Sequence, residues 1–228
     1  MRPQPRKTVQ IVGAAPSLLD CPVIEGAERW LFNASHVADG GRPYTRVFNL
    51  HHKAMILGLQ PKAWQWYQEQ DKPVYLLETD PEIPHSIAFP LITLMTYFAS
   101  DQHGSGVEEE ACFGCSLDFL IAFALWEGFE HIDLIGIECR SEEEYREQRS
   151  SVMYWMGYAR GLGRTITTTR SSGLATVAAI YGYNLPTGSP SPPGQPKAIW
   201  LHGHPHSTWP IPETFKDPIL INGAFEHP

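Results

Sequence analysis

The sequence lacks the features that define several common protein classes. Only 4 of its 228 residues are cysteine, too few for a disulfide framework, which favours a reducing cytoplasm. The longest apolar run, Phe119–Trp126, falls far short of the roughly 20 residues that span a bilayer. Met1–Lys7 is basic, but the apolar stretch of a secretory signal does not follow it. We therefore expect a cytoplasmic protein without a membrane partner.

Basic residues are also scarce, with 17 Lys and Arg against 25 Asp and Glu. This balance disfavours a nucleic-acid polymer as the partner, because proteins that bind one are normally basic. A single nucleotide remains possible, since backbone amides and one arginine can hold it. The hydrophobic fraction of 43% argues against global disorder.

Proline is abundant but unevenly distributed, with ten residues in 1–185 and ten in 186–228. We predict a folded domain over 1–185 and an extended proline-rich arm over 186–228, which packs on the body, on a partner or on a second copy of the chain. The arm contains His202, His204 and His206, which lie on one side of an extended chain. They either bind a transition metal or are simply solvated; we assign no metal site.

In the body, short apolar runs alternate with helical patterns, which predicts an α/β sandwich of three layers around a mostly parallel sheet. The expected strands are Val9–Val12, Trp30–Phe32, Val47–Leu50, Val74–Leu77, Ile132–Ile137 and Thr165–Thr169. The expected helices are 61–70, 116–127, 142–160 and 174–181, and 81–105 is read as a loop leading to a helix.

Ligands of parallel sheets bind beyond the carboxyl ends of the strands. That rule predicts one site from the segments that follow the strands. They are Gly13–Ser17, Asn33–His36, Asn49–Lys53, Glu78–Asp80 and Glu138–Tyr145.

The first of these segments, Gly13-Ala14-Ala15-Pro16-Ser17, is a turn of small residues after a strand. Such a turn lets backbone N–H groups approach a phosphate, with a helix N-terminus behind it. It matches neither G-x-G-x-x-G nor a Walker A loop, which disfavours both a standard NAD-binding protein and a P-loop kinase. The alternative is an ordinary strand-to-helix turn.

Polar side chains follow the second and third strands. Asn33 and Asn49 each carry a donor and an acceptor that suit a base edge or a ribose. His51 and His52 are candidate general bases, because imidazole titrates near neutral pH. The alternative for each residue is loop capping.

Ser116, after Gly114-Cys115, is predicted to be the N-cap of a helix and a candidate anion-binding residue. Glu138 follows a strand and is a candidate for binding a ribose hydroxyl, a metal or a proton. Cys112 and Cys115 form a C-x-x-C pair, for which buried structural cysteines are favoured over a redox motif.

Tyr145, Gln148 and Arg149 form one helical turn of mixed polar groups after Glu138. Arg149 is a candidate clamp for a phosphate or carboxylate, and Tyr145 is a candidate for stacking or donating a proton. The alternative is a solvated helix surface.

Taken together, several motifs resemble a known group of proteins. They are Gly13-Ala14-Ala15-Pro16-Ser17-Leu18, Asn33, Phe48-Asn49, Ser116 with Ala122 and Gly128, and the run from Ile132 to Glu138. They resemble the Rossmann-like group that includes 6-hydroxymethylpterin pyrophosphokinase-like proteins, flagellar motility accessory factors and bacterial CMP-sialic acid sialyltransferases. The segment from Glu144 to Gly163 looks like small tailed-phage members of this group, which would place the protein in a host cytoplasm.

The resemblance covers about residues 8–185 and implies a Rossmann-like fold with a nucleotide or nucleotide-sugar ligand. It implies that Gly13–Ser17 and Ser116 hold phosphates, and that Asn33 and Asn49 hold the nucleoside. The chain departs from the group's pattern at Ala14-Ala15 and at Glu138, where Asp is usual. We therefore expect a transferase-like nucleotide-binding enzyme, or alternatively a non-catalytic phage protein that senses a nucleotide or binds another protein.

Overall fold

The fold is taken from a computed structural model, which describes residues 7–102, 112–139, 148–169, 171–172, 174, 198–199 and 219–220, without the side chains of 99–102, 198–199 and 219–220. The chain divides into two compact units, Met1–Ala175 and Thr176–Pro228. In the second unit, β8 (Ala198–Ile199) pairs antiparallel with β9 (Ile219–Leu220). The predicted boundary at 185 and the three arm histidines lie outside the described residues, so both remain predictions.

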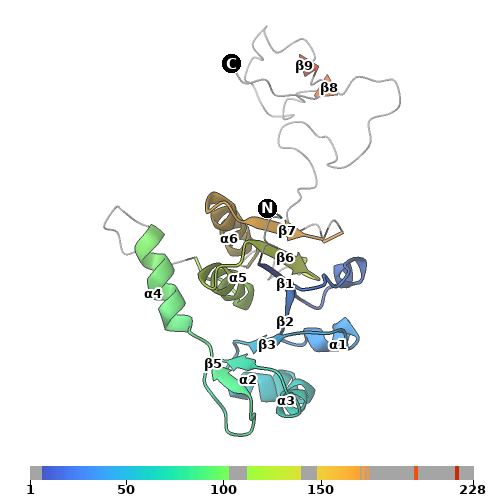
Figure 1. The fold of residues 1–228 in the computed structure, drawn as a ribbon, viewed down its shortest axis with the longest axis vertical. Helices are drawn as coiled ribbons and strands as arrows, with labels where there is room; N and C mark the ends of the chain where they lie inside the picture. The colour runs from blue at the N-terminus through green and yellow to red at the C-terminus, as the bar shows by residue number, and fades with distance from the viewer. Residues whose placement is uncertain are drawn as a thin grey trace, which may run out of the picture. The chain divides into compact units, whose positions relative to one another are not determined.

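The first unit is built on a seven-stranded sheet in the order β5-β4-β3-β2-β1-β6-β7. All neighbouring pairs in this sheet are parallel. The strands are β1 (Thr8–Val12), β2 (Glu28–Phe32), β3 (Arg46–Asn49), β4 (Val74–Leu76), β5 (Ser86–Ala88), β6 (His131–Ile135) and β7 (Thr165–Thr168). The α/β fold with a parallel sheet is therefore confirmed (Figure 1).

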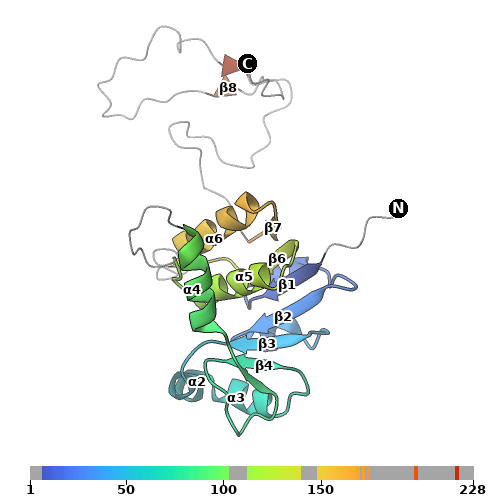
Figure 2. The ribbon, with the colours of Figure 1, turned by 60° about the vertical axis from the view of Figure 1, so that its left-hand side comes forward.

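The helices form a layer on each side of the sheet (Figures 1 and 2). One side carries α4 (Leu91–Gln102), α5 (Ser116–Trp126) and α6 (Arg149–Gly161). The other side carries a 3-10 helix, η1 (Pro16–Asp20), with α1 (Ser35–Asp39), α2 (Lys53–Leu59) and α3 (Pro61–Gln68). The three predicted layers are thus present.

The core explains why short apolar runs suffice to form this sheet. Trp30 is fully buried on one face, with its ring centroid 5.0 Å from that of Phe48 and 5.5 Å from that of Phe123. Helix α5 packs between α4 and α6, and its residues from Leu120 to Ala124 are at most 2% exposed. An almost wholly apolar helix is stable in water only in such a covered position.

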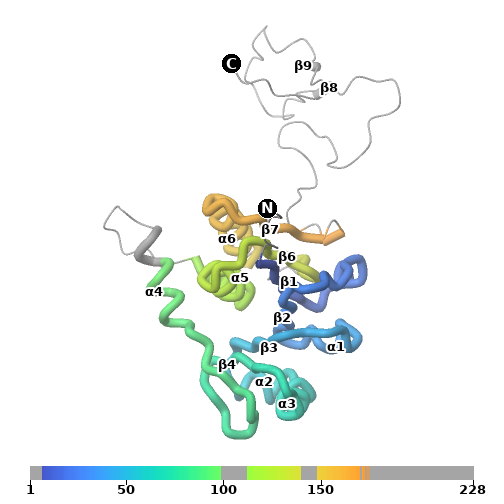
Figure 3. The backbone as a smooth tube through the Cα atoms, viewed as in Figure 1, coloured from blue at the N-terminus to red at the C-terminus, as the bar shows by residue number. Residues whose placement is uncertain are grey.

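The order of the strands creates a switch point beside β1. The chain adds β2, β3, β4 and β5 on one side of β1, and then returns to place β6 on the other side. Figure 3 shows β2, β3 and β4 on one side of β1, and β6 and β7 on the other. In open parallel sheets, such a reversal leaves a crevice between the two neighbouring strand ends.

Several local predictions were wrong. The three-residue edge strand β5 was read as loop because Pro81, Pro84 and Pro90 surround it, although prolines are compatible with a sheet edge. The short helices α1 and α2 were not expected. The N-cap of α5 is Cys115 rather than Ser116, which is the first helical residue. Helix α6 begins at Arg149, and the segments predicted as helix at 142–147 and 175–181 lie outside the described residues.

Candidate functional site

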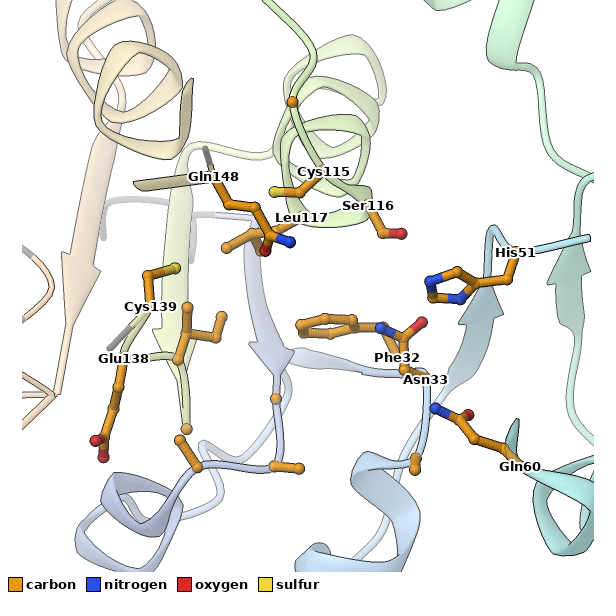
Figure 4. A pocket seen from close by; sticks show the side chains of 17 residues that line it. Phe32, Asn33, His51, Gln60, Cys115, Ser116, Leu117, Glu138, Cys139 and Gln148 are labelled. Carbon is orange, nitrogen blue, oxygen red and sulfur yellow. The ribbon is translucent and has the colours of Figure 1, made fainter. Parts of the chain in front are cut away.

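A cavity of about 630 Å³ lies at the carboxyl ends of β1, β2, β3 and β6, where the strand order reverses. The loops after these strands and the start of α5 form its walls (Figure 4). Its described lining consists of Gly13, Ala14, Ala15, Phe32, Asn33, Ala34, His51, Gln60, Gly114, Cys115, Ser116, Leu117, Gly136, Ile137, Glu138, Cys139 and Gln148.

The loops after β1 and β6 approach each other closely at Gly13 and Gly136. Backbone hydrogen bonds join them, from Gly13 N to Ile135 O at 2.8 Å and from Ala15 N to Gly136 O at 2.9 Å. A Cβ on Gly13 would lie 2.4 Å from the Gly136 carbonyl oxygen. Gly136 also has a φ of +63°, which favours glycine. The absence of side chains at these two glycines therefore lets the loops after β1 and β6 pack against each other at the base of the cavity.

The structure brings together seven of the thirteen residues predicted for the site. Gly13, Ala14, Ala15, Asn33, His51, Ser116 and Glu138 all line the cavity. Pro16 and Ser17 lie in η1 instead, Asn49 is buried beneath the cavity, and His52 lines a neighbouring one. Arg149 does not line the described wall, although the preceding Gln148 does, and Tyr145 lies outside the described residues.

Carboxylates already accept hydrogen bonds from several backbone amides that the sequence analysis suggested as phosphate ligands. The backbone N–H of Ser17 donates to Glu138 Oε1 at 3.1 Å. At the start of α5, the amides of Gly114 and Cys115 donate to Asp118 Oδ2 at 2.8 and 3.0 Å. A phosphate at either position would have to displace a carboxylate or bind beside it. The roles predicted for Gly13–Ser17 and Ser116 remain predictions.

A hydrogen-bonded chain fixes the imidazole of His51. The backbone N–H of His51 donates to Asn49 Oδ1 at 3.2 Å, which identifies this amide atom as the oxygen. The His51 Nδ1 atom lies 2.8 Å from the same oxygen and must therefore carry the proton. Asn49 Nδ2 then donates to Tyr67 Oη at 3.0 Å, and Tyr67 donates to the Asn33 carbonyl at 2.8 Å.

This chain leaves Nε2 of His51 unprotonated, which is the form that accepts a proton. Partial burial lowers the pKa of His51 below its ordinary value, so the imidazole is neutral at pH 7. Asn49 is 1% exposed and Tyr67 is fully buried, so the support beneath His51 is shielded from water. In Figure 4 the imidazole and the Ser116 hydroxyl extend toward the same part of the cavity.

The side of the cavity near β2 combines an aromatic ring with two carboxamides. Phe32 and Asn33 lie next to each other at the end of β2, and Gln60 extends toward them from the start of α3 (Figure 4). The Asn33 and Gln60 side-chain oxygens are buried and accept no hydrogen bond in the described part of the chain. Both oxygens can accept hydrogen bonds from a ligand in the cavity after the two side chains rotate toward it.

Phe32 and Gln60 line the cavity but were not predicted, whereas Cys139 lies in the predicted segment Glu138–Tyr145 without a role assigned to it. Phe32 was assigned only to its strand, and Gln60 reaches the site because α2, which was missed, turns the chain back. The sequence signals were Phe32 directly before Asn33 and Gln60 directly before Pro61. Cys139 has a φ of +48°, which an amino-acid pattern does not reveal.

The C-x-x-C pair has none of the electrostatics of a redox motif. Burial raises the pKa of Cys115 to about 12 and also raises the pKa of Cys112, whereas redox-active thiols have lowered pKa values. Cys112 is exposed and Cys115 is only partly buried, so the prediction of two buried cysteines was wrong. The described residues include no cluster of three potential metal ligands. None of the described helices has the length and apolar character needed to cross a membrane.

No family model matches the chain, and no curated protein matches its sequence. Among solved structures, the sialyltransferase CstII from Campylobacter jejuni in complex with cytidine-5'-monophosphate has a TM-score of 0.44 and 13% identity, over 72% of this chain and 80% of that one. The monofunctional α-2,3-sialyltransferase Cst-I from the same organism has a TM-score of 0.45 and 12% identity, over 72% and 76%. At these values the likeness transfers no residue role and no ligand to this chain.

Proposed function

We propose that this chain is a nucleotide- or nucleotide-sugar-binding, transferase-like protein whose ligand occupies the cavity at the switch point. The observation that carries the proposal is the ring of Phe32 beside the carboxamides of Asn33 and Gln60, whose oxygens accept no hydrogen bond from the described residues. A nucleoside has the complementary chemistry, because its base is a flat aromatic ring and its edges and ribose carry N–H and O–H donors.

His51 supplies the acid–base function in this proposal. Its neutral imidazole presents Nε2 as a proton acceptor, and the Asn49–Tyr67 chain holds the ring in place. The role is to take the proton of an attacking hydroxyl as the bond to the nucleotide phosphate breaks. Glu138 and Ser116 lie in the same cavity, where they can contact ribose hydroxyls and phosphate. Arg149, next to Gln148, is the proposed source of positive charge.

A second candidate is a non-catalytic nucleotide sensor or protein-interaction module. It is favoured by the absence of lysine and arginine from the described lining and by Glu138, whose carboxylate already binds the Ser17 amide. Both features weaken the hold on a phosphate. Turnover of a bound ligand that is lost in His51→Ala would distinguish an enzyme from a sensor.

A thermal-shift panel of nucleoside monophosphates, nucleoside diphosphates and nucleotide sugars tests both candidates. A ligand at 100 times its Kd stabilises the native state by about 2.7 kcal/mol, which raises the Tm of a domain of this size by about 5 to 10 °C. We expect Gln60→Ala to reduce that shift. Gln65→Ala, a matched change at an exposed position of α3, should preserve it. If no member of the panel shifts the Tm, the proposed function is wrong.

A further inference from the structure

The hydroxyl group of Ser116 has no role in the part of the fold that the structure describes. Ser116 is the first residue of α5, and it lines the cavity at the switch point. The start of the helix is capped without it, because Asp118 Oδ2 accepts the amides of Gly114 and Cys115 at 2.8 and 3.0 Å. No hydrogen bond within the described residues involves the Ser116 hydroxyl. This polar group is therefore available to a molecule in the cavity.

The imidazole of His51 has the orientation and the tautomer that a base for such a hydroxyl requires. Its Nδ1 donates to Asn49 Oδ1 at 2.8 Å, which leaves Nε2 unprotonated. Figure 4 shows the ring and the Ser116 hydroxyl directed into the same part of the cavity. A serine becomes a nucleophile when a neutral imidazole takes its proton and a third group holds that imidazole. Ser116, His51 and Asn49 supply these three parts.

The three side chains are positioned by separate elements of the fold. Asn49 ends β3 and is 1% exposed, and its Nδ2 donates to the buried phenol of Tyr67 at 3.0 Å. Ser116 is positioned by α5, whose apolar residues pack in the core. Within the described residues, no hydrogen bond joins Ser116 to His51. Catalytic pairs are often open without substrate and tighten when it binds, so the serine hydroxyl has to rotate toward Nε2.

The lining indicates the class of substrate. Phe32, Leu117 and Ile137 are apolar, the described lining holds no lysine or arginine, and its one carboxylate is Glu138. An anionic group would find no cation there, whereas an uncharged acyl group can pack against the apolar side chains. The backbone N–H of Ser116 has no acceptor inside its own helix. It can donate to the oxygen that becomes negative when a carbonyl group is attacked.

We infer that Ser116, His51 and Asn49 form a triad that hydrolyses carboxylic esters with an uncharged acyl group. Ser116 is the nucleophile and His51 is the acid and base, whereas Asn49 is a positioning residue that acts through His51. This activity goes beyond the proposed nucleotide binding, although it uses the same cavity, and it requires no nucleotide. Either proposal can therefore fail without the other.

The reaction takes place in two halves. In the first, Ser116 Oγ forms a bond to the ester carbonyl carbon while its proton moves to His51 Nε2. The bond from that carbon to the alcohol oxygen then breaks, and the alcohol leaves with the proton from Nε2, so that an acyl-serine remains. In the second half, water attacks the same carbon and gives a proton to Nε2, and Oγ leaves and takes that proton back. One ester and one water are consumed, and one acid and one alcohol are released.

Labelling of the full-length protein with an alkyl fluorophosphonate tests the nucleophile directly, because this probe phosphonylates activated serines with loss of fluoride. We expect one adduct per chain, and peptide mass spectrometry should place it on Ser116. His51→Ala should slow the labelling at least about a hundredfold, because the base is lost. His85→Ala, the same change at an exposed histidine that does not line the cavity, should leave the rate unaltered.

Hydrolysis of p-nitrophenyl acetate and p-nitrophenyl hexanoate, measured on the same samples, tests turnover. Ser116→Ala should lower kcat/KM at least about a hundredfold. Ser150→Ala, at an exposed position in the first turn of α6, should not change it. The p-nitrophenyl monoester of adipic acid, whose acyl group carries a carboxylate, should react at least about tenfold more slowly than the hexanoate. Circular dichroism shows that each variant is folded, and the adduct on wild-type protein needs no variant.

Several results would overturn the inference. They are the absence of an adduct, an adduct on a residue other than Ser116, labelling of His51→Ala at the wild-type rate, and equal hydrolysis by Ser116→Ala and Ser150→Ala. Wild-type protein that hydrolyses neither uncharged ester would overturn it as well, and an adipate ester cleaved as fast as the hexanoate would reject the substrate class. The nucleotide thermal shift is a separate measurement, so its absence rejects the proposed function and leaves the esterase proposal to these tests.

Discussion

The Nδ1 atom of His51 lies 2.8 Å from the side-chain oxygen of Asn49, an amide that is 1% exposed. Because the same oxygen also accepts the His51 backbone N–H, the proton on the imidazole is assigned to Nδ1. The geometry therefore sets which ring nitrogen can act as a base. Asn49 at the end of β3, together with the phenol of Tyr67, therefore fixes which nitrogen of the His51 ring carries the proton.

The first prediction concerns that tautomer. In wild-type protein above pH 7, long-range ¹H–¹⁵N NMR should show His51 protonated at Nδ1, whereas free imidazole side chains favour Nε2. Asn49→Leu removes the acceptor and should shift His51 toward the Nε2-protonated form. A wild-type spectrum with the proton on Nε2 would contradict the hydrogen-bonded chain. His52, which is exposed, serves as the internal reference for an unconstrained ring.

The phenol of Tyr67 is predicted to matter for both stability and pH behaviour. Burial raises its pKa to about 12, so its absorbance should show no phenolate until well above pH 10. Tyr67→Phe leaves Asn49 Nδ2 and the Asn33 carbonyl without their partner and should cost about 1–3 kcal/mol of unfolding free energy. Urea denaturation measures this loss, and an unchanged midpoint would mean that the chain does not stabilise the fold.

Acidification should destabilise the protein through its half-buried histidines. Burial lowers the pKa of His51 and of His36, whose ring stacks on Trp66 with centroids 4.1 Å apart. The unfolded chain therefore binds more protons than the native state as the pH falls through about 6.5, and stability decreases there. Urea midpoints measured from pH 7.5 to 5.5 should fall, and the double variant His36→Gln/His51→Gln should flatten the slope. If the urea midpoint of the double variant falls with pH as steeply as that of wild type, His36 and His51 are not the cause of the destabilisation by acid.

The close approach at the switch point predicts an unequal cost for two similar glycine substitutions. Gly136 and Gly128 both have positive φ, +63° and +79°, but a Cβ on Gly128 would meet nothing within 4 Å. Gly128→Ala should cost about 1–2 kcal/mol for the backbone conformation alone. Gly136→Ala should cost more, because its Cβ would lie 2.8 Å from the Gly13 carbonyl oxygen. Equal losses in chemical denaturation would show that the loops after β1 and β6 are not packed as described.

The sequence allowed the parallel sheet and the strand ends to be predicted, because buried strands such as β1 and β6 are short apolar runs that end at glycine or at a polar residue. Residues directly after a strand, such as Asn33 and His51, could be placed at one edge by the same rule. Elements without a strong pattern were missed: β5 has three residues between prolines, and α2 has only seven. Because these elements were not predicted, the position of Gln60 and the separation of the strand-end residues into two cavities were missed as well.

The roles of residues that hold other residues in position could not be predicted from the sequence either. Asn49 was expected to contact a nucleoside, yet its carboxamide is engaged by His51 and by Tyr67, a residue for which the sequence predicted only a place in the helix 61–70. Such a partnership depends on the packing of α3 against the end of β3. Likewise, the pairing of Glu138 with the Ser17 amide joins residues 121 positions apart.

The most direct test of the central claim is isothermal titration of the best nucleotide from the panel into wild-type protein and Asn33→Gly. Glycine suits the φ of +52° at this position, so the substitution removes the carboxamide without straining the backbone. The account predicts saturable binding to wild type with one site per chain, and an affinity at least about tenfold lower in Asn33→Gly. Equal affinity in the two proteins would place the nucleotide outside the switch-point cavity and contradict the account.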